Sequence, residues 1–401
     1  MSKHIASDRA AAPRRIACFE AGYDSWYGAQ RSLATLIQAL PAERAEAIIV
    51  TTAPGALATG AAAQGIPVHV LAGGAGVSVS GMTRSRPGPL RLAALLLGLC
   101  RVNLASLRWV RQQKIDVLYA NNARALTYFL LPALLLRLPV IWYVRIDQRL
   151  RGLFPLALRV ADKVICITAA VGERAFTAQE RRDYARRFEV LWTGFPLPPS
   201  DQGDALRTAV RGELGLGPGQ RLLLAVGSVS ERKGHDVLVD AFLQLAPARP
   251  ELCLAIAGDP AAEAQGFLAQ LQARIGDAGL AGRVFWLGYR SDVPALYAAA
   301  DLVVLPSKAE GLPRVVPEAL SMGRAIVASD AGGTRELLQD PGFGSVVHPL
   351  TPEGIAAAVE HHLADPALND APHAARRRRF VAERLSVAAY RDGFLGLLDE
   401  L

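Results

Sequence analysis

Two glutamates, Glu310 and Glu318, are separated by seven residues in a segment that reads as strand, loop and short helix. The strand ends at Pro306, Pro317 stands in the first turn of the expected helix, and Gly323 ends it. An ionised carboxylate only accepts hydrogen bonds, so two of them at opposite ends of a loop suit a ligand with many hydroxyl groups. The alternatives are a helix-dipole charge for Glu318 and an exposed loop charge for Glu310. The placement around proline and glycine favours a functional pair.

The loop between the two glutamates is a candidate site for a phosphate or an array of sugar hydroxyls. We expect the backbone N–H groups around 312–316 to be unpaired and close to the positive end of the helix. The candidate contacts in the loop are Gly311, Leu312, Pro313 and Val315.

A second group of candidates follows the expected strand Leu222–Val226. The sequence GSVSERKG, residues 227–234, is a small-residue turn with two cations that leads into a helix, which suits a diphosphate. Lys233 would act there as a point charge and Arg232 as a planar fork. The alternative is a basic turn exposed to solvent.

Polar residues also follow two strands in the first half of the chain. Asn121 and Asn122 come after Val117–Ala120, where they could bind acceptor hydroxyls or cap the next helix; the cap is slightly favoured. Arg145 and Asp147 end the segment WYVRID and are candidates for contacts to an acceptor or leaving group.

The sequence contains few patterns of residues that could bind a metal ion. The chain has no D-x-D sequence, and the carboxylates near the candidate site are not closely spaced. Its four cysteines, Cys18, Cys100, Cys166 and Cys253, include no C-x-x-C pair, which argues against a disulfide framework and a thiolate zinc site. We therefore expect neither a metal nor another cofactor, and a reducing compartment.

The charge differs between the two halves of the 401-residue chain. Residues 1–200 carry 25 Lys and Arg against 12 Asp and Glu, whereas residues 201–401 carry 19 against 25. A basic first half suits an anionic membrane surface or substrate, or is simply a solvated basic face. Nucleic acid is not expected, because no helix-turn-helix, zinc or aromatic-basic pattern accompanies the charge. The N-terminus has no secretory signal pattern, so a cytoplasmic protein is expected.

Two apolar stretches call for a membrane test. Leu126–Val144 is interrupted by proline and arginine, and Leu90–Cys100 is about half of the ~20 residues that a span needs. An interfacial role for residues 84–113 is one interpretation, and a core helix with an arginine-rich outer face is the favoured one.

Short apolar runs alternate with helical stretches along the whole chain, which predicts repeated βαβ units and parallel sheets. The expected strands of the first half are 15–19, 47–51, 67–71, 117–120, 140–144, 164–167 and 189–192. Those of the second half are 222–226, 253–257, 284–287, 302–305, 325–328 and 345–347. Between the two series, Gly194–Asp204 is rich in proline and glycine and is the expected linker.

This pattern predicts two doubly wound, Rossmann-like α/β domains, 1–195 and 205–380, that face each other across a cleft. Residues 381–401 are expected to form a helix that packs back toward the N-terminal domain, within an amphipathic helix over Phe380–Leu401. The basic run Arg376–Arg379 before it is expected to be a solvated helix end.

The segment from Asp301 to Gly333 resembles the E-x7-E signature of the family 4 retaining glycosyltransferases, which have the two-domain GT-B fold. The resemblance continues through VGSVSERKGHDVLVDAF (226–242), LGYRSDVPALYAAADLVVLPS (287–307) and the Gly332–Gly333 turn with Glu336. YGAQRSLATL (27–36) and VICITAAV (164–171) extend it into the first half. It implies that Glu310 contacts the transferred sugar and Glu318 the ribose of a nucleotide.

The sequence departs from the family pattern at three places. Ser228 occupies the position of a usual arginine, so Arg232 would have to substitute or one cation is missing. The family pattern has two glycines before the first helix; here Gly28 is one of them, and Tyr27 replaces the other. Gly28 is a candidate for close approach of the backbone to the donor phosphates, or else an ordinary turn glycine. Tyr143 replaces a usual histidine and is an acceptor candidate. Base recognition is expected from the 288–291 loop, with Tyr289 and Arg290 as donor-binding candidates.

The resemblance implies transfer of a sugar from a nucleoside-diphosphate sugar to a glycan or lipid-linked acceptor, with the configuration retained. Glu310, Lys233, Arg145 and Asp147 are the candidate catalytic residues. The basic first half of the chain favours a lipid-linked acceptor and peripheral contact at the inner face of an anionic membrane, which would place such an enzyme in surface polysaccharide or glycolipid synthesis. Two alternatives stay open: a non-hydrolysing sugar-nucleotide epimerase and a catalytically silent sugar-nucleotide-binding protein.

Overall fold

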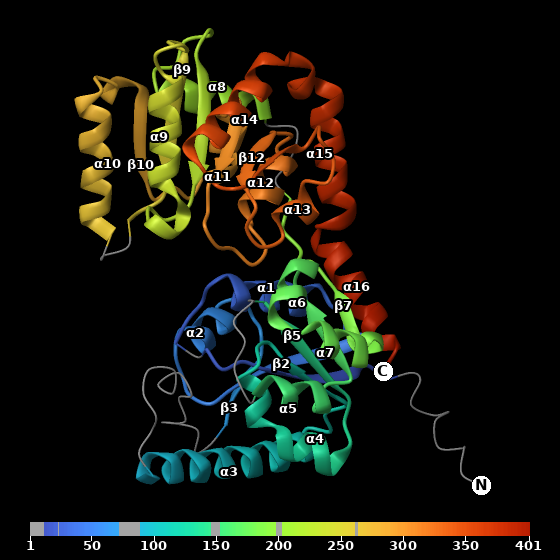
Figure 1. Cartoon of the computed structure of the whole chain (residues 1–401). Helices are drawn as coiled ribbons and strands as arrows, with labels where there is room; N and C mark the ends of the chain where they lie inside the picture. Colours follow the sequence, from blue (N-terminus) through green and yellow to red (C-terminus); the bar gives the residue numbers. More distant parts are fainter. Residues whose placement is uncertain (1–11, 23, 72–88, 146–152, 198–202, 261–263) are drawn as a thin grey trace. The chain divides into compact units, whose positions relative to one another are not determined.

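A computed structural model describes residues 12–22, 24–71, 89–145, 153–197, 203–260 and 264–401 (Figure 1). The chain forms two compact units. Unit 1 comprises Met1–Gly194 and Val387–Leu401, and unit 2 comprises Phe195–Ser386. The last fifteen residues therefore leave the second unit and complete the first.

Unit 1 contains a seven-stranded parallel sheet in the order β3-β2-β1-β4-β5-β6-β7. Its strands are β1 (Arg14–Phe19), β2 (Ala45–Thr51), β3 (Val68–Val70), β4 (Val117–Ala120), β5 (Val140–Val144), β6 (Lys163–Cys166) and β7 (Phe188–Val190). The helices that flank them are α1 (Gly28–Ala39), α2 (Ala56–Ala62), α3 (Pro89–Gln112), α4 (Leu130–Leu136), α5 (Leu153–Val160), α6 (Ala169–Ala175), α7 (Ala178–Asp183) and α16 (Val387–Asp399). The strand order reverses between β1 and β4, and ligands of open parallel sheets bind beyond the carboxyl ends of strands at such a point.

Unit 2 repeats this plan with a six-stranded parallel sheet in the order β10-β9-β8-β11-β12-β13. Its strands are β8 (Arg221–Val226), β9 (Leu252–Ala257), β10 (Val284–Gly288), β11 (Leu302–Leu305), β12 (Ile326–Ser329) and β13 (Gly344–Val347). The helices are α8 (Gly203–Glu213), α9 (His235–Leu245), α10 (Gln265–Asp277), α11 (Val293–Ala299), α12 (Val315–Ser321), α13 (Thr334–Leu337), α14 (Pro352–Ala364) and α15 (Ala371–Arg384). Here the order reverses between β8 and β11.

All thirteen expected strands are present in the structure, within two residues at either end. Their short apolar runs are buried because helices cover the parallel sheets, as shown by the fully buried strands β4, β5, β9 and β11. The predicted class, two doubly wound α/β units, is therefore confirmed.

The single helix expected over Phe380–Leu401 is wrong. Helix α15 ends at Arg384, and α16 begins at Val387 in the other unit. The break coincides with a backbone contact that sequence periodicity does not encode: the Leu385 carbonyl accepts a hydrogen bond from the Phe195 N–H at 2.8 Å. Leu385 is also fully buried, which fixes the chain at the point of the break.

The basic run Arg376–Arg379 lies within α15 and is only partly solvated: Arg376 and Arg379 are exposed, whereas Arg377 is completely buried inside unit 2. Its guanidinium donates to the carbonyls of Gly342 at 2.8 Å and Gly323 at 3.0 Å, and also to that of Leu368. Burial lowers the pKa of Arg377 to about 10, so the group is still charged at neutral pH. It joins the β12 and β13 ends of the sheet to α15.

Helix α3 differs from the favoured expectation of a core helix. Among the described residues, Ala93–Gln112 is long and apolar enough to cross a membrane by length and composition, but only 28% of its apolar window is buried. Leu97 and Leu104 are about half exposed, whereas Val102 and Val110 are buried. The outer face of α3 is thus partly apolar rather than entirely basic.

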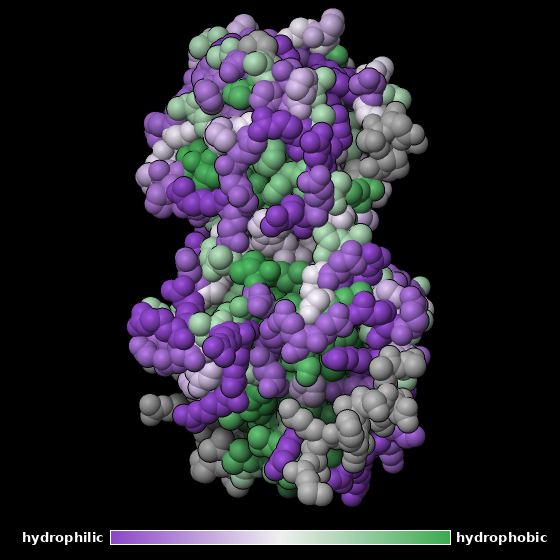
Figure 2. All heavy atoms as spheres, turned by 90° about the vertical axis from the view of Figure 1, so that its right-hand side faces the viewer, coloured by the Kyte–Doolittle hydropathy of each residue, from purple (hydrophilic) through white to green (hydrophobic). Residues whose placement is uncertain are grey.

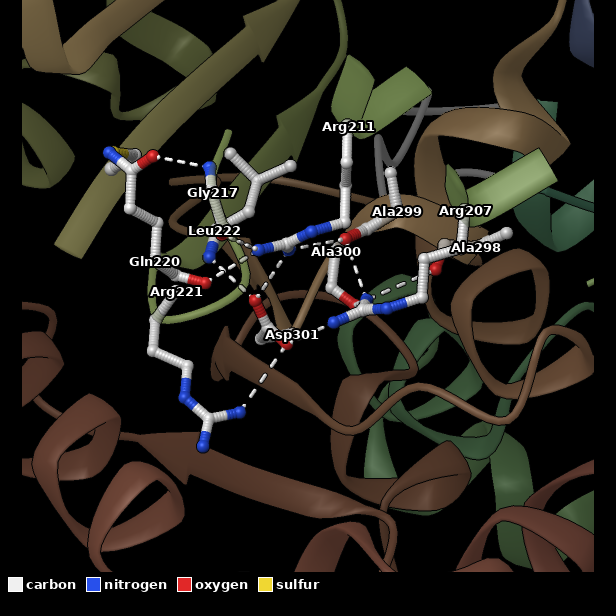
Figure 3. A network of polar contacts seen from close by, with 11 residues as sticks. Arg207, Arg211, Gly217, Gln220, Arg221, Leu222, Ala298, Ala299, Ala300 and Asp301 are labelled. Atoms are coloured by element: carbon white, nitrogen blue, oxygen red, sulfur yellow. Dashed lines mark hydrogen bonds and ion pairs between the residues drawn. The ribbon is translucent and has the colours of Figure 1, made fainter. Parts of the chain in front are cut away.

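A buried carboxylate at the amino end of β11 connects three elements of unit 2 (Figure 3). Asp301 Oδ1 accepts from Arg207 at 2.7 Å, and Oδ2 accepts from Arg211 at 3.1 Å and from the Leu222 N–H at 2.7 Å. Burial alone would raise the pKa of Asp301, but the Leu222 N–H and the two guanidinium groups outweigh it and hold the pKa below its usual value. This network ties α8 to β8 and β11 at the opposite end of the sheet from the polar loops.

We predict that Asp301→Asn lowers the free energy of unfolding of unit 2 by about 3 kcal/mol, because it leaves the charges of Arg207 and Arg211 without a carboxylate partner. Since the folded-state pKa of Asp301 is depressed, its contribution is present above the ordinary value of 3.8 and is lost as the pH falls through the lower folded value. Hydrogen exchange of β8 and β11 peptides across a urea series measures the change. The exposed Asp277→Asn in the same unit should change it by less than about 0.5 kcal/mol. Equal stability of Asp301→Asn and the wild type would contradict the assignment.

Candidate functional site

The polar loops of unit 2 meet beyond the carboxyl ends of β8 and β11. This is the place where the strand order of the sheet reverses, and we call it the switch point. The turn after β8 and the loop after β11 are joined by backbone contacts: the Lys308 N–H donates to the Arg232 carbonyl at 2.9 Å. The Arg232 guanidinium in turn donates to the Ala309 carbonyl at 3.0 Å. Two segments that are about 75 residues apart in sequence therefore form one continuous polar surface.

An ion pair between Lys233 and Glu310 lies at the centre of this surface. The Lys233 Nζ is 2.6 Å from Glu310 Oε1, and the two side chains are only 17% and 13% exposed. Partial burial lowers the local dielectric constant, so this contact is stronger than an ion pair in open solvent. The structure thus brings together the two residues that the sequence nominated separately as diphosphate and sugar contacts.

Two glycines allow the loops to approach one another. Gly234 has a φ of +69°, and a Cβ there would lie 1.9 Å from the Pro306 carbonyl oxygen. Gly332 has a φ of +57°, and a Cβ there would lie 2.2 Å from the Gly311 carbonyl oxygen. The next residue, Gly333, donates its N–H to that same oxygen at 2.9 Å. The Gly332–Gly333 turn therefore supports the loop that carries Glu310, which is a structural role.

Glu318 lies in α12 with partners of its own. Tyr297 donates to its Oε2 at 3.0 Å, and Arg314 donates to its Oε1 at 3.2 Å. Burial raises the pKa of Glu318 above its ordinary value, although Arg314 and Tyr297 act in the opposite direction. Within the described ranges, no hydrogen bond or ion pair joins Glu318 to Glu310.

The expectation that all N–H groups around 312–316 are unpaired is wrong in one position. The Val316 N–H donates to the Pro313 carbonyl at 3.1 Å, because the chain makes a tight turn before α12. Leu312, Pro313 and Val315 are buried, whereas Gly311 is partly exposed and the Arg314 side chain is exposed.

The remaining donor candidates of unit 2 differ in how available they are. Ser228 and Arg232 are exposed, and Tyr289 is 75% exposed while its N–H donates to Asp259 at 2.9 Å. Arg290 is held by two carboxylates, Glu213 at 2.5 Å and Asp292 at 2.7 Å. Because its charge is already neutralised, Arg290 is a poorer anion ligand than the sequence suggested.

The switch point of unit 1 holds a buried polar network that includes an unexpected residue, Glu20. Glu20 is 1% exposed and accepts from the side-chain amides of Asn121 and Asn122, each at 2.5 Å, and from the Gly22 N–H at 2.8 Å. Its position directly after the buried strand β1 matches that of the asparagines after β4, and this is the sequence signal that identifies it. A buried carboxylate is retained only where such donors satisfy it.

Asn121 links Glu20 to Arg145. Its Oδ1 accepts from Arg145 Nε at 3.0 Å, and Arg145 also donates to the Ser32 hydroxyl at 3.2 Å. Asn122 Oδ1 accepts from the Ala125 N–H at 3.0 Å, so Asn122 caps the turn that follows, as one of the two interpretations predicted.

Tyr143 is too deeply buried to contact an acceptor. It is 1% exposed, its hydroxyl donates to the Leu191 carbonyl at 2.6 Å, and the Arg145 guanidinium lies 3.9 Å above its ring. The prediction of an acceptor contact is therefore replaced by a supporting role beneath Arg145. Asp147 lies outside the described residues. Gly28 is the first residue of α1, and a Cβ there would contact nothing within 4 Å, so no neighbouring residue requires a glycine.

No group of three or more His, Cys, Asp or Glu side chains that could hold a metal ion occurs in the part of the chain that the structure describes. The two switch points thus contain charged pairs and amides: a lysine–glutamate pair in unit 2 and a glutamate–asparagine–arginine network in unit 1. These groups can bind hydroxyls and phosphates through charge-assisted hydrogen bonds.

The chain is similar in sequence to curated proteins and in fold to solved structures. The lipopolysaccharide core biosynthesis mannosyltransferase LpcC of Rhizobium leguminosarum bv. viciae is 36% identical over 151 residues, 38% of this chain and 43% of the relative. LpsB of Rhizobium meliloti, with the same description, is 31% identical over 218 residues, 52% and 58% of the two chains. The chain thus spans about half the length of the curated relatives it matches. HepE of Anabaena in complex with UDP has a TM-score of 0.77 at 23% identity, covering 97% of this chain and 100% of that one.

Two family models cover most of the sequence, one for each unit. The model described as Glycosyltransferase Family 4 matches residues 26–194, and the one described as Glycosyl transferases group 1 matches residues 207–379. Both matches agree with the two parallel sheets and with the fold of HepE. The chain belongs to the family 4 glycosyltransferases and has the GT-B fold.

Proposed function

We propose that this protein transfers a hexose from a nucleoside-diphosphate sugar to a glycan or lipid-linked acceptor, with retention of configuration. The observation that carries the proposal is the Lys233–Glu310 pair at the switch point of unit 2. It offers a cation for a diphosphate and a carboxylate for sugar hydroxyls within one ion-pair distance. The names of the curated relatives support an acceptor of the lipopolysaccharide core, and hence a cytoplasmic enzyme of surface polysaccharide synthesis.

In the proposed reaction, the ion pair opens when the donor binds. Lys233 Nζ moves from Glu310 to an oxygen of the diphosphate, and Glu310 accepts hydrogen bonds from the sugar. As the glycosidic bond breaks, negative charge develops on the departing diphosphate, where Lys233 and the exposed Arg232 stabilise it. The sugar passes through an oxocarbenium-like transition state, and no residue acts as a covalent nucleophile. The acceptor oxygen forms the new bond to the anomeric carbon on the face that the diphosphate leaves, and the proton of the acceptor hydroxyl passes to a departing diphosphate oxygen.

The acceptor is proposed to bind at unit 1. Arg145 is oriented by four neighbours, Asn121, Ser32, the Tyr390 hydroxyl and the Tyr143 ring, and we propose that it donates to an acceptor hydroxyl or anionic group. Glu20 acts one step further back, because its carboxylate fixes the Asn121 amide that contacts Arg145. A buried, hydrogen-bonded network of this kind holds a guanidinium in place at little entropic cost on binding.

The two alternatives are less well supported. Epimerisation of a sugar nucleotide needs no acceptor-binding unit, and the matched relatives are named as transferases. A silent binding protein would use the same Lys233–Glu310 pair to bind a donor, and it is the names of the matched relatives, which are transferases, that favour catalysis over binding alone. The HepE complexes contain UDP and UDP-glucose, which supports a nucleoside-diphosphate hexose as the donor class here.

We predict opposite effects for the two members of the pair on nucleotide binding. Lys233→Met should weaken binding of the nucleoside diphosphate by about 10- to 100-fold, because it removes a charge-assisted hydrogen bond of roughly 1.5–3 kcal/mol. Glu310→Gln should leave that binding unchanged or tighten it, since it frees Lys233. Both variants should lower kcat/KM for sugar transfer by at least about tenfold. Titration calorimetry with UDP and GDP, followed by transfer assays, measures these effects.

Lys308→Met is the matched control, because Lys308 lies in the same loop and pairs at 3.0 Å with Asp236 instead. It should bind nucleotide and transfer sugar like the wild type. Unchanged nucleotide affinity in Lys233→Met, or weakened affinity in Glu310→Gln equal to that in Lys233→Met, would contradict the proposed roles.

Glu318 gives a pH dependence to nucleoside binding. If its carboxylate accepts from ribose hydroxyls, binding requires the ionised form, and a raised pKa means that protonation begins at a higher pH than for an ordinary glutamate. Affinity for the nucleoside alone, which has no titrating phosphate, should therefore fall as the pH drops toward 4.5, with the loss starting above that value. Glu318→Gln should bind about tenfold more weakly at neutral pH and lose this dependence. A wild-type affinity that stays constant over this range would contradict the ribose contact.

Lys233 and Arg232 provide the positive charge that a divalent metal supplies in other transferases, so we propose that the reaction needs no metal. Full turnover in excess EDTA is the expected result. Loss of activity in EDTA that only Mg²⁺ or Mn²⁺ restores would overturn this part of the proposal.

A further inference from the structure

Unit 1 exposes a group of leucines on three helices that pack against one another, α3 with α4 and α4 with α5. We call this group the leucine face; its members are Leu96, Leu97, Leu104, Leu134, Leu135 and Leu156. The first five are between 49% and 65% exposed. Figure 2 shows hydrophobic side chains in view at this end of unit 1. Exposed leucines gathered in this way mark an interaction surface rather than scattered surface residues.

The leucine face continues into a basic stretch on the same side of α3. Leu97, Leu104, Arg108 and Arg111 are spaced by seven, four and three residues, which places them along one face of a helix. The opposite side, with Val102 and Trp109, is buried in unit 1, where the Trp109 ring stacks on His69 with centroids 4.7 Å apart. The helix is thus fixed along the unit with an apolar and cationic side outward.

The charge around this surface is mostly positive. Residues 47–161 contain thirteen Lys and Arg but only two Asp and Glu, Asp116 and Asp147. The cations exposed on or next to α3, α4 and α5 are Arg101, Arg108, Arg111, Lys114, Arg137 and Arg159. Within the described part of the chain, no ion pair involves any of these six side chains. Their charge is therefore available to an anionic partner.

These features favour a lipid surface over other occupants. A second copy of this face would bring arginines against arginines, which is unfavourable in a symmetric contact. A helix that spans a bilayer would have to release Val102 and Trp109 from the core of unit 1 and carry three arginines, Arg101, Arg108 and Arg111, into or beside the hydrocarbon. A helix with leucines and arginines on its outer side instead lies along the membrane plane, with leucines in the acyl boundary and cations at the headgroups.

We propose that the leucine face and its flanking arginines dock unit 1 onto an anionic lipid bilayer. The docking surface is formed by α3, α4 and α5 and includes none of the residues assigned to sugar transfer. It would place the Arg145 network of unit 1 on a body attached to the membrane, where a lipid-linked acceptor is confined.

Flotation with lipid vesicles tests this proposal on the full-length protein without any sugar donor. We expect the wild type to float with phosphatidylglycerol/phosphatidylcholine vesicles at low salt, and much less with pure phosphatidylcholine or at high salt. Arg108→Gln/Arg111→Gln should reduce the partition coefficient by at least about fivefold, the effect of one basic residue near an anionic surface. Leu97→Gln/Leu104→Gln should reduce it by about tenfold or more, because two exposed leucines no longer enter the bilayer.

The matched charge control is Arg186→Gln/Arg379→Gln, which removes two exposed arginines outside α3, α4 and α5 and should bind vesicles like the wild type. Circular dichroism and nucleotide binding should be unchanged in all variants, so that loss of vesicle binding is separated from misfolding and from failure of the transfer proposal. The proposal is overturned if the wild type does not float with anionic vesicles, or if both α3 variants float as the wild type does. A dimer in solution that Leu97→Gln/Leu104→Gln dissociates, without vesicle binding, would assign the leucine face to a second copy instead.

Discussion

The candidate donor site depends on one contact, the ion pair between Lys233 and Glu310 at the point where the sheet of unit 2 reverses its strand order. Two parallel strands, β8 and β11, lie next to each other there, and each ends in a loop that cannot pair with a further strand. The partly buried side chains of these loops are satisfied by one another, by water or by a ligand. A lysine and a glutamate that pair in the free protein, and that can each exchange the partner for a phosphate or a hydroxyl, meet both conditions.

The surroundings of the pair explain why it forms. Gly234 and Gly332 remove the Cβ atoms that would keep the two loops apart, and the Gly333 N–H holds the Gly311 carbonyl. At the opposite end of the same sheet, Asp301 fixes the amino end of β11 to β8 and α8. Unit 1 applies the same principle with different residues, because Glu20 and Arg145 are connected through Asn121 at its own switch point.

The strands and the nominated residues of the donor site could be predicted because they follow from local patterns: short apolar runs, and glycine, proline and charge after a strand. The contacts could not, because they join distant segments. Nothing in the spacing of residues 233 and 310 indicates that they form a pair, and the burial of Arg377 depends on carbonyls supplied by two other loops. The break between α15 and α16 likewise coincides with a backbone contact to Phe195, about 190 residues earlier in the chain. Glu20 had a readable signal, a polar residue directly after a buried strand at the switch point.

A crystal structure of the protein with a bound, unreactive nucleoside-diphosphate sugar analogue tests the central claim most directly. The account predicts that the contact between Lys233 and Glu310 is broken, with Lys233 Nζ within about 3 Å of a diphosphate oxygen and the Glu310 carboxylate on the hydroxyls of the sugar. An analogue bound elsewhere, with the ion pair intact and the loops after β8 and β11 empty, would contradict it.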